Sequence, residues 1–128
     1  HVSQDVLFVP LDCARVIKTS GDGNCMFSAI CRGLAEVLQH SAAPSPTSLR
    51  TQVVDYICNH AREDYQGLPF SEWMSLSRGL TMAEYGVRME KPHGLDAESW
   101  GGALEASVAA NLHQVSVHIF EAVIGGFE

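Results

Sequence analysis

The amino-acid sequence predicts a single α+β domain whose elements follow in the order strand, helices, strand. Several segments repeat apolar residues at three- and four-residue steps, which is the pattern of amphipathic helices. Residues 115–120 instead alternate with period two, with apolar side chains at positions 115, 117 and 119, as in a half-buried strand. The length of 128 residues fits one domain, and the sequence contains no repeat, linker or low-complexity segment.

The first expected element is a short strand at residues 6–9, which are apolar and include two β-branched valines. Pro10 ends this segment and indicates an edge strand or an extended arm, because proline cannot donate a backbone hydrogen bond. Residues 14–18 are also expected to be extended. The run 19–24, Thr-Ser-Gly-Asp-Gly-Asn, concentrates turn-forming residues and predicts a loop.

A helix is predicted to begin directly after this loop. Asn24 suits the N-cap, which places Cys25 at the first helical position. The apolar face of this helix is expected to consist of Phe27, Ile30, Leu34, Val37 and Leu38.

Further helices are expected between this first helix and the last strand. Their predicted ranges are 47–62, 71–77 and a short helical or irregular piece around 82–89, followed by a polar surface loop at 90–99. The last helix is expected to open at residues 100–102 with Ser99 as its cap. Its apolar stripe is Leu104, Val108 and Leu112, and residues 124–128 resemble the start of a turn.

Composition and charge argue against several classes of function. Eight basic and fifteen acidic residues give a net charge of −7, which argues against a non-specific nucleic-acid binder. No apolar stretch approaches the roughly 18–20 residues of a membrane span, and the N-terminus does not have the pattern of a signal peptide. We expect no metal or organic cofactor, because no His/Cys set has ligand spacing and no phosphate-binding loop occurs.

The four cysteines form no CxxC pair and are too few for a disulfide scaffold, so a reducing compartment is expected. Cys13, Cys31 and Cys58 are expected to pack as small apolar side chains. Cys25 differs because the partial positive charge at a helix start favours the thiolate, which is the nucleophilic form. The glycines before it let backbone N–H groups turn inward and form an oxyanion hole, as acyl transfer requires. The alternative is a simple turn followed by a buried, inert cysteine.

Residues 21–30, Gly-Asp-Gly-Asn-Cys-Met-Phe-Ser-Ala-Ile, closely resemble the cysteine signature of the ovarian tumour (OTU) family of deubiquitinating proteases. Leu49-Arg50 with residues 53–57 is similar to the family's second helix. Residues 99–109 resemble its tryptophan-glycine helix, and residues 115–120 resemble the central strand that follows. The resemblance covers about residues 18–120 in the family's order, and the run 100–107 also resembles OTU domains of viral polyproteins.

The resemblance implies a papain-like fold with a small central β-sheet flanked by helices and the nucleophile at a helix N-terminus. It implies a thiol protease that cleaves after the C-terminal glycine of ubiquitin, polyubiquitin or a ubiquitin-like modifier, in the cytoplasm of its own or a host cell. Cys25 would be the nucleophile, and the backbone around Asp22, Gly23 and Cys25 would hold the oxyanion. Asn24, Trp100 and Gly101 are candidate substrate-binding residues. Core packing is the alternative for Trp100, and a turn-forming role is the alternative for Asp22.

The sequence departs from the family at the general base. The family's histidine follows the strand matched by residues 115–120, in a His-aromatic-Asp or His-aromatic-Asn string that is not found here. We therefore expect the catalytic histidine beyond Glu128 and residues 1–128 to be a truncated domain. Two alternatives stay open, namely a non-catalytic ubiquitin-binding module and a viral protease that cuts polyprotein junctions. Structural or solvent roles are expected for the six histidines present, which are His1, His40, His60, His93, His113 and His118.

Overall fold

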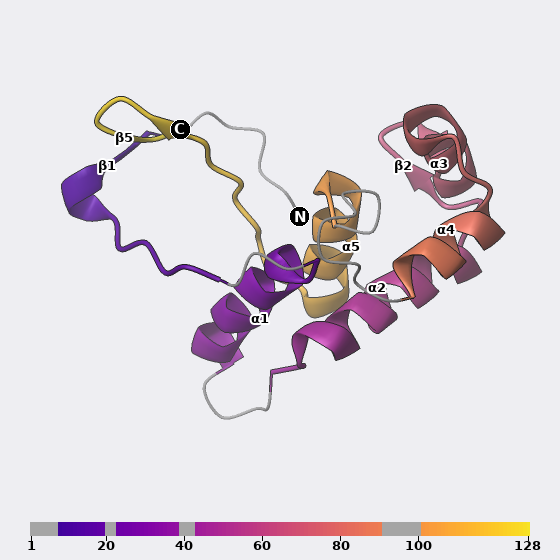
Figure 1. The fold of residues 1–128 in the computed structure, drawn as a ribbon, viewed down its shortest axis with the longest axis horizontal. Helices are drawn as coiled ribbons and strands as arrows, with labels where there is room; N and C mark the ends of the chain where they lie inside the picture. Colours follow the sequence, from indigo (N-terminus) through magenta and orange to yellow (C-terminus); the bar gives the residue numbers. More distant parts are fainter. Residues whose placement is uncertain (1–7, 20–22, 39–42, 91–100) are drawn as a thin grey trace.

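The structure is a computed structural model that describes residues 8–19, 23–38, 43–90 and 101–128. Helices form most of it, and two small antiparallel sheets complete it, so the predicted α+β class is confirmed (Figure 1). The helical elements are η1 (Leu11–Cys13), α1 (Cys25–Leu38), α2 (Pro46–Asn59), α3 (Phe70–Arg78), α4 (Met82–Met89) and α5 (Ala103–His113). The strands are β1 (Val9–Pro10), β2 (Asp64–Tyr65), β3 (Leu68–Pro69), β4 (Ala122–Val123) and β5 (Gly126–Phe127).

The core lies between the helices, with α2 in contact with α1, α4 and α5. Apolar side chains at three- and four-residue steps give α2 one buried face, as the sequence pattern predicts. Each such side chain that is fully buried contributes about 1.5–3 kcal/mol of transfer free energy. The fully or almost fully buried apolar residues include Phe27, Leu34, Leu49, Val53, Ile57, Phe70, Met74, Tyr85, Met89 and Ala109.

Local capping fixes where several helices begin and end. Ser45 caps α2 by accepting a hydrogen bond from the Ser48 N–H at 3.1 Å, and Pro46 occupies the first helical position. The helix α3 ends at Gly79, whose φ of 65° lies in the left-handed region that favours glycine. The predicted range 47–62 was too long at its C-terminal end, because α2 ends at Asn59 and a turn leads into the β2–β3 hairpin.

The last helix begins later than the sequence predicted. Gly102 occupies the N-cap position of α5, and the side chain of Glu105 accepts a hydrogen bond from the Gly102 N–H at 2.6 Å. The expectation that Ser99 caps this helix was therefore wrong, because Glu105 satisfies the first amide of a helix that begins at Ala103. Ser99 itself lies outside the described residues.

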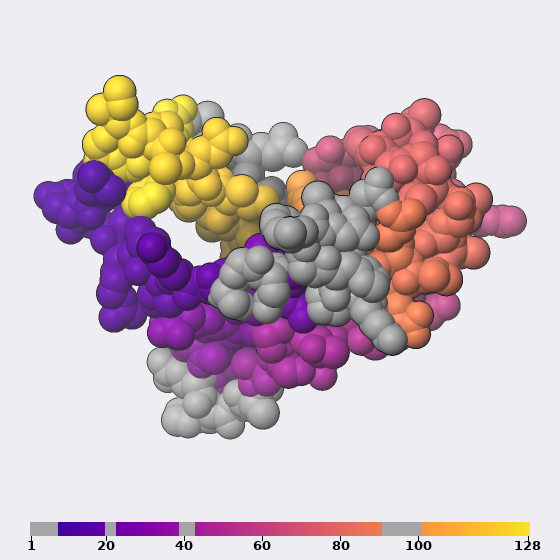
Figure 2. All heavy atoms as spheres, in the orientation of Figure 1, coloured from indigo at the N-terminus to yellow at the C-terminus, as the bar shows by residue number. Residues whose placement is uncertain are grey.

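The larger sheet has the strand order β1-β5-β4 and lies at one end of the molecule (Figure 1). Val9 pairs with Phe127 and Pro10 with Gly126, so β1 is an edge strand, as Pro10 indicated. The expectation that Pro10 ends the strand was wrong, because a proline on an edge strand can still occupy a paired position. The turn between β4 and β5 uses Gly125 at a φ of 84°, in agreement with the expected turn. Figure 2 shows an opening between the N-terminal and C-terminal segments that lead from the helices to this sheet.

The sheet differs from the expected small central sheet flanked by helices. Its strands are two residues long, and two-residue strands have no continuous apolar face to bury against a helix. The predicted strand at residues 115–120 is also not part of this sheet. This segment follows α5 as extended chain, in which Val115 and Val117 are half-buried while Ser116 and His118 are exposed. The period-two pattern is thus present, and Val117 belongs to an isolated β-bridge, but the strand pairs among the described residues do not include this segment.

Candidate active site

Cys25 is the first residue of α1, as the sequence predicted. The carbonyl of Asn24 accepts a hydrogen bond from the Ser28 N–H at 2.8 Å, which places Asn24 at the N-cap. The side chain of Cys25 is half-buried, and its thiol is free. A helix start carries partial positive charge from unpaired N–H groups, so the position favours an oxyanion close to it.

The buried guanidinium of Arg50 holds the two residues before Cys25. Arg50 comes from α2 and is 1% exposed. Its Nε donates a hydrogen bond to Asn24 Oδ1 at 2.7 Å, and its Nη2 donates to the carbonyl of Gly23. The sequence pattern included Arg50 only as part of a helix similar to that of the family. An arginine between Leu49 and Val53 on the buried face of a helix was the signal that could have revealed it.

Gly101 lies against the first turn of α1. A Cβ atom at this position would lie 2.5 Å from Met26 Cε and 3.1 Å from Phe27 Cε2. The start of α5 therefore packs directly beside the residue that follows Cys25. Of the five candidate site residues besides Cys25, the structure brings Gly23, Asn24 and Gly101 to this region, while Asp22 and Trp100 lie outside the described residues.

A buried carboxylate fixes the position of the α5 start. Glu105 is fully buried and forms a 2.6 Å ion pair with Arg78 at the end of α3. Its other oxygen accepts a hydrogen bond from the Tyr85 hydroxyl of α4 at 3.0 Å. Burial, followed by the charge of Glu105, raises the pKa of Tyr85, so this phenol stays a donor. Through these contacts of Glu105, the helices α3, α4 and α5 together fix the position of the chain next to Gly101.

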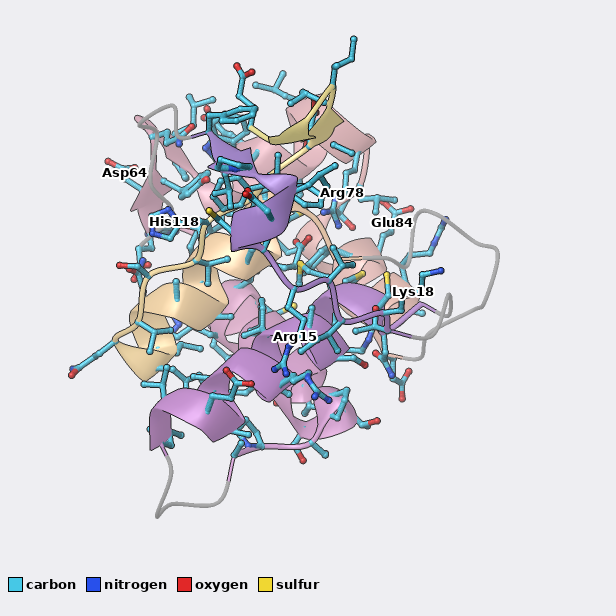
Figure 3. All side chains as sticks on the ribbon, turned by 90° about the vertical axis from the view of Figure 1, so that its left-hand side faces the viewer. Arg15, Lys18, Asp64, Arg78, Glu84 and His118 are labelled. Atoms are coloured by element: carbon cyan, nitrogen blue, oxygen red, sulfur yellow. The ribbon has the colours of Figure 1, made fainter. Side chains whose placement is uncertain are left out.

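The described histidines have partners other than Cys25. His60 Nδ1 donates a hydrogen bond to the Tyr56 carbonyl at 2.8 Å, and the His60 ring stacks on the Tyr56 ring. His113 lies 2.7 Å from Gln52 Oε1, and His118 is exposed next to Phe120 (Figure 3). Within the described ranges, no hydrogen bond joins a histidine to the Cys25 thiol. The remaining three, His1, His40 and His93, lie outside those ranges.

The other cysteines differ in exposure. Cys31 is buried in the core, and burial raises the pKa of its thiol. Cys58 is half-buried, and its pKa is raised by burial and then by the negative charge of Asp55. Cys13 is exposed, so the expectation that it packs in the core was wrong, because η1 buries no residue.

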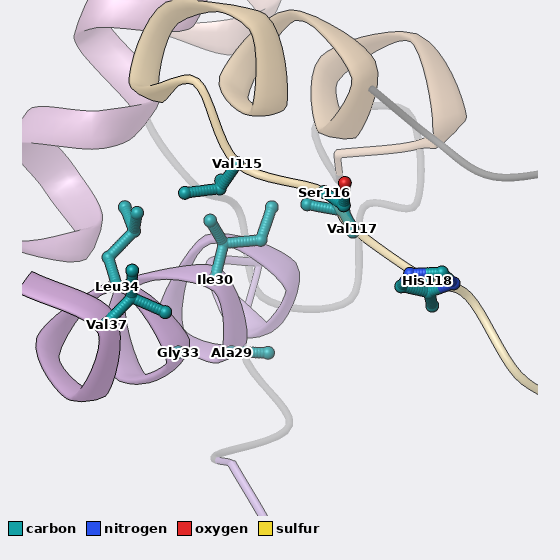
Figure 4. Close-up of a pocket in the computed structure, with 9 residues that line it drawn as sticks. All are labelled: Ala29, Ile30, Gly33, Leu34, Val37, Val115, Ser116, Val117 and His118. Atoms are coloured by element: carbon teal, nitrogen blue, oxygen red, sulfur yellow. The ribbon is translucent and has the colours of Figure 1, made fainter.

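An apolar pocket of about 280 Å³ lies away from the first turn of α1 (Figure 4). Ile30 and Leu34 of α1 line one side, and Val115 and Val117 line the other. Its lining contains none of the residues 23–28. The pocket is therefore part of the contact between α1 and the extended C-terminal segment rather than of the Cys25 region.

The part of the chain that the structure describes has two further properties. No group of three His, Cys, Asp or Glu side chains there would hold a metal ion. None of the helices there is long and apolar enough to cross a bilayer.

Comparison with known proteins gives one family and one relative. The model of the family described as OTU, OTU-like cysteine protease, matches residues 20–126. A protein of Tipula iridescent virus named "Putative ubiquitin thioesterase L96" is 35% identical over 77 residues. This match covers 60% of the present chain and 8% of the viral protein, so the chain spans a small part of that relative. No solved structure matches the chain.

Proposed function

This chain belongs to the OTU-like cysteine protease family, and from that premise we propose that it is a cysteine-dependent deubiquitinase. The observation that carries the proposal is the free, half-buried thiol of Cys25 at the first position of α1, inside the matched residues 20–126. The name of the viral relative supports ubiquitin as the substrate.

In the proposed reaction, the Cys25 thiolate attacks the carbonyl carbon after the C-terminal glycine of ubiquitin. Backbone N–H groups of Asp22, Gly23 and Cys25 stabilise the oxyanion of the tetrahedral intermediate. This intermediate collapses to a thioester, and the lysine amine of the substrate leaves with a proton from a histidine. The proton given to the amine is the one that the histidine first took from the Cys25 thiol. The histidine then takes a proton from water, whose oxygen bonds to the thioester carbonyl carbon. The C–S bond breaks, so that ubiquitin leaves with a free C-terminal carboxyl group and Cys25 is again a thiolate beside the protonated histidine.

We propose that the histidine is supplied by chain beyond Glu128, together with the Asp or Asn that orients it. His60 and His113 are engaged with Tyr56 and Gln52, which supports a base from elsewhere. The finer assignments, with Asn24, Gly101 and Trp100 contacting the tail of ubiquitin, are part of the same proposal. A reducing compartment such as the cytoplasm suits an enzyme that needs a free thiol.

The experiment uses the full-length protein and ubiquitin that carries an electrophile at its C-terminus. A covalent adduct is expected, and Cys25→Ala should abolish it. The matched control is Cys13→Ala, because Cys13 is also free and is more exposed than Cys25. Labelling that survives Cys25→Ala but disappears in Cys13→Ala would contradict the proposal.

A second candidate function is a non-catalytic OTU module that binds ubiquitin. The engagement of the described histidines away from Cys25 favours it. Micromolar binding of ubiquitin by the full-length protein, with neither adduct nor cleavage, would support this module over the enzyme. Cleavage of a viral polyprotein junction by the full-length protein would instead support the alternative that the protein is a viral protease that processes polyproteins.

A further inference from the structure

Arg50 donates hydrogen bonds from all three nitrogens of its guanidinium, and two of these bonds hold the residues before Cys25. Besides the bonds to Asn24 and Gly23, its Nη1 donates to the Met89 carbonyl at 3.3 Å. The guanidinium carbon also lies 4.9 Å from the centre of the Phe27 ring, in a cation–π arrangement. One buried cation from α2 thus contacts the loop before Cys25, the first turn of α1 and the end of α4.

The hydrogen bond from Arg50 to the Gly23 carbonyl fixes the orientation of the whole peptide group between Gly23 and Asn24. In a planar trans peptide, the C=O of one residue and the N–H of the next point in opposite directions. Because the Gly23 carbonyl points at Arg50, the Asn24 N–H points away from it. The bond to Asn24 Oδ1 holds the next side chain as well. The peptide that enters the helix start at Cys25 therefore has a single imposed orientation.

The planar fork of arginine suits this task, because it presents donors in fixed relative directions. A lysine at the same position is a single flexible point charge and would not hold both acceptors in one geometry. Burying a cation also costs free energy that an apolar residue on the same helix face would avoid. Stability alone therefore gives little reason for an arginine at position 50.

We propose that Arg50 is a positioning residue. It holds the Gly23–Asn24 peptide, which lies between the Gly23 and Cys25 N–H groups, and thereby sets the directions in which these two groups face the oxyanion formed at Cys25. It acts through the loop and contacts neither substrate nor the reacting sulfur. This inference rests on the proposed protease function of Cys25 and adds the residue that orients its loop.

The test compares two reactions of the full-length protein. The first is hydrolysis of ubiquitin with a fluorogenic amide at its C-terminus, which passes through an oxyanion. The second is alkylation of Cys25 by iodoacetamide, which does not. Arg50→Lys should lower kcat about 100-fold, as loss of an oxyanion donor does, with KM changed less than about threefold. The alkylation rate of Cys25 should stay within about threefold, because thiol access is unchanged.

Val53→Ala is the matched control, because Val53 is fully buried on the same face of α2 and its apolar side chain cannot donate the hydrogen bonds that Arg50 makes to Gly23 and Asn24. It should lower the melting temperature and leave kcat of the folded protein near that of the wild type. If Arg50→Lys keeps kcat within about threefold of the wild type, the positioning role is wrong.

Asn24→Ala covers the case in which Arg50→Lys does not fold. It removes the acceptor of Arg50 Nε and should lower kcat about 10-fold with the alkylation rate unchanged. An unchanged kcat in Asn24→Ala would then overturn the inference. A wild-type protein that neither hydrolyses the substrate nor forms the ubiquitin adduct contradicts the proposed function itself, which separates the two failures.

Discussion

Glycine at position 101 lets the chain before α5 lie directly against the first turn of α1. The atoms that a Cβ would meet belong to Met26 and Phe27, the two residues that follow Cys25. Met26 ends in a flexible thioether, whereas Phe27 is fully buried in the core. The residue type at position 101 therefore controls how closely two helix starts approach one another.

Gly101→Ala is expected to destabilise the fold by about 1–3 kcal/mol, because the new methyl group overpacks this contact. Shortening the neighbour in Gly101→Ala/Met26→Ala should recover part of that loss, since the closest atom is Met26 Cε. Urea unfolding measures both changes.

Gly33→Ala is the control for that experiment. Gly33 lies within α1, and a Cβ there would meet nothing within 4 Å. Its replacement should stabilise the protein by up to about 1 kcal/mol through helix propensity. Equal effects of alanine at positions 101 and 33 would contradict the packing described for Gly101.

At the scale of elements, Glu105 joins α5 to α3 and α4. A fully buried carboxylate is tolerated only where hydrogen bonds and an ion pair compensate for its lost hydration. Arg78, Tyr85 and the Gly102 N–H supply them. The cluster therefore determines where α5 begins and, with it, the place of Gly101 beside α1.

Glu105→Ala should cost about 3–5 kcal/mol, because it leaves Arg78 without its carboxylate partner in a partly buried place. Tyr85→Phe should cost less, about 1–3 kcal/mol, since it removes one donor to a carboxylate that keeps two others. Glu72→Ala, at an exposed position of α3, is the control and should change stability by less than about 0.5 kcal/mol. Denaturant unfolding measures the free energy of unfolding of the three variants. A Glu105→Ala protein as stable as Glu72→Ala would contradict the role of Glu105 in fixing the start of α5.

The start of α4 carries a pH-dependent contribution to stability. Thr81 and Glu84 form a capping box, in which the Thr81 N–H donates to Glu84 Oε1 at 3.0 Å. Hydrogen bonds from the Thr81 backbone and side chain lower the pKa of the Glu84 carboxyl from its ordinary value of 4.5. A lowered pKa in the folded state stabilises the protein above the unfolded-state value, and this contribution is lost as pH falls through the folded-state value.

Glu84→Ala should therefore be less stable than the wild type at neutral pH. The difference should shrink as pH falls below 4.5, where the wild-type carboxylate takes up its proton. Unfolding curves of both proteins across this pH range provide the measurement. A stability difference that stays constant down to low pH would contradict the contribution of the charged carboxylate.

For the molecule as a whole, local signals in the sequence were the reliable ones. The turn-rich run before Cys25 and the apolar face after it predicted the start of α1, because capping and periodicity are properties of neighbouring residues. Local signals could not predict whether the extended segment at residues 115–120 is part of a sheet. An extended segment becomes part of a sheet only when another strand pairs with it, and pairing is a long-range property.

The candidate site also has a part that local sequence signals predicted and a part that they did not. Cys25 and its loop were identified from adjacent residues, whereas the bonds of Arg50 to Gly23 and Asn24 join positions 26 and 27 residues apart. Contacts that close over such separations are set by the packed fold rather than by any local motif.

The proposed function depends on Cys25 acting as a nucleophile toward ubiquitin conjugates. The most direct measurement is cleavage of diubiquitin by the full-length protein, compared with its Cys25→Ala and Cys13→Ala variants. We predict that the wild type and Cys13→Ala release monomeric ubiquitin, and that Cys25→Ala releases none. Release of ubiquitin by Cys25→Ala at the wild-type rate would contradict the account.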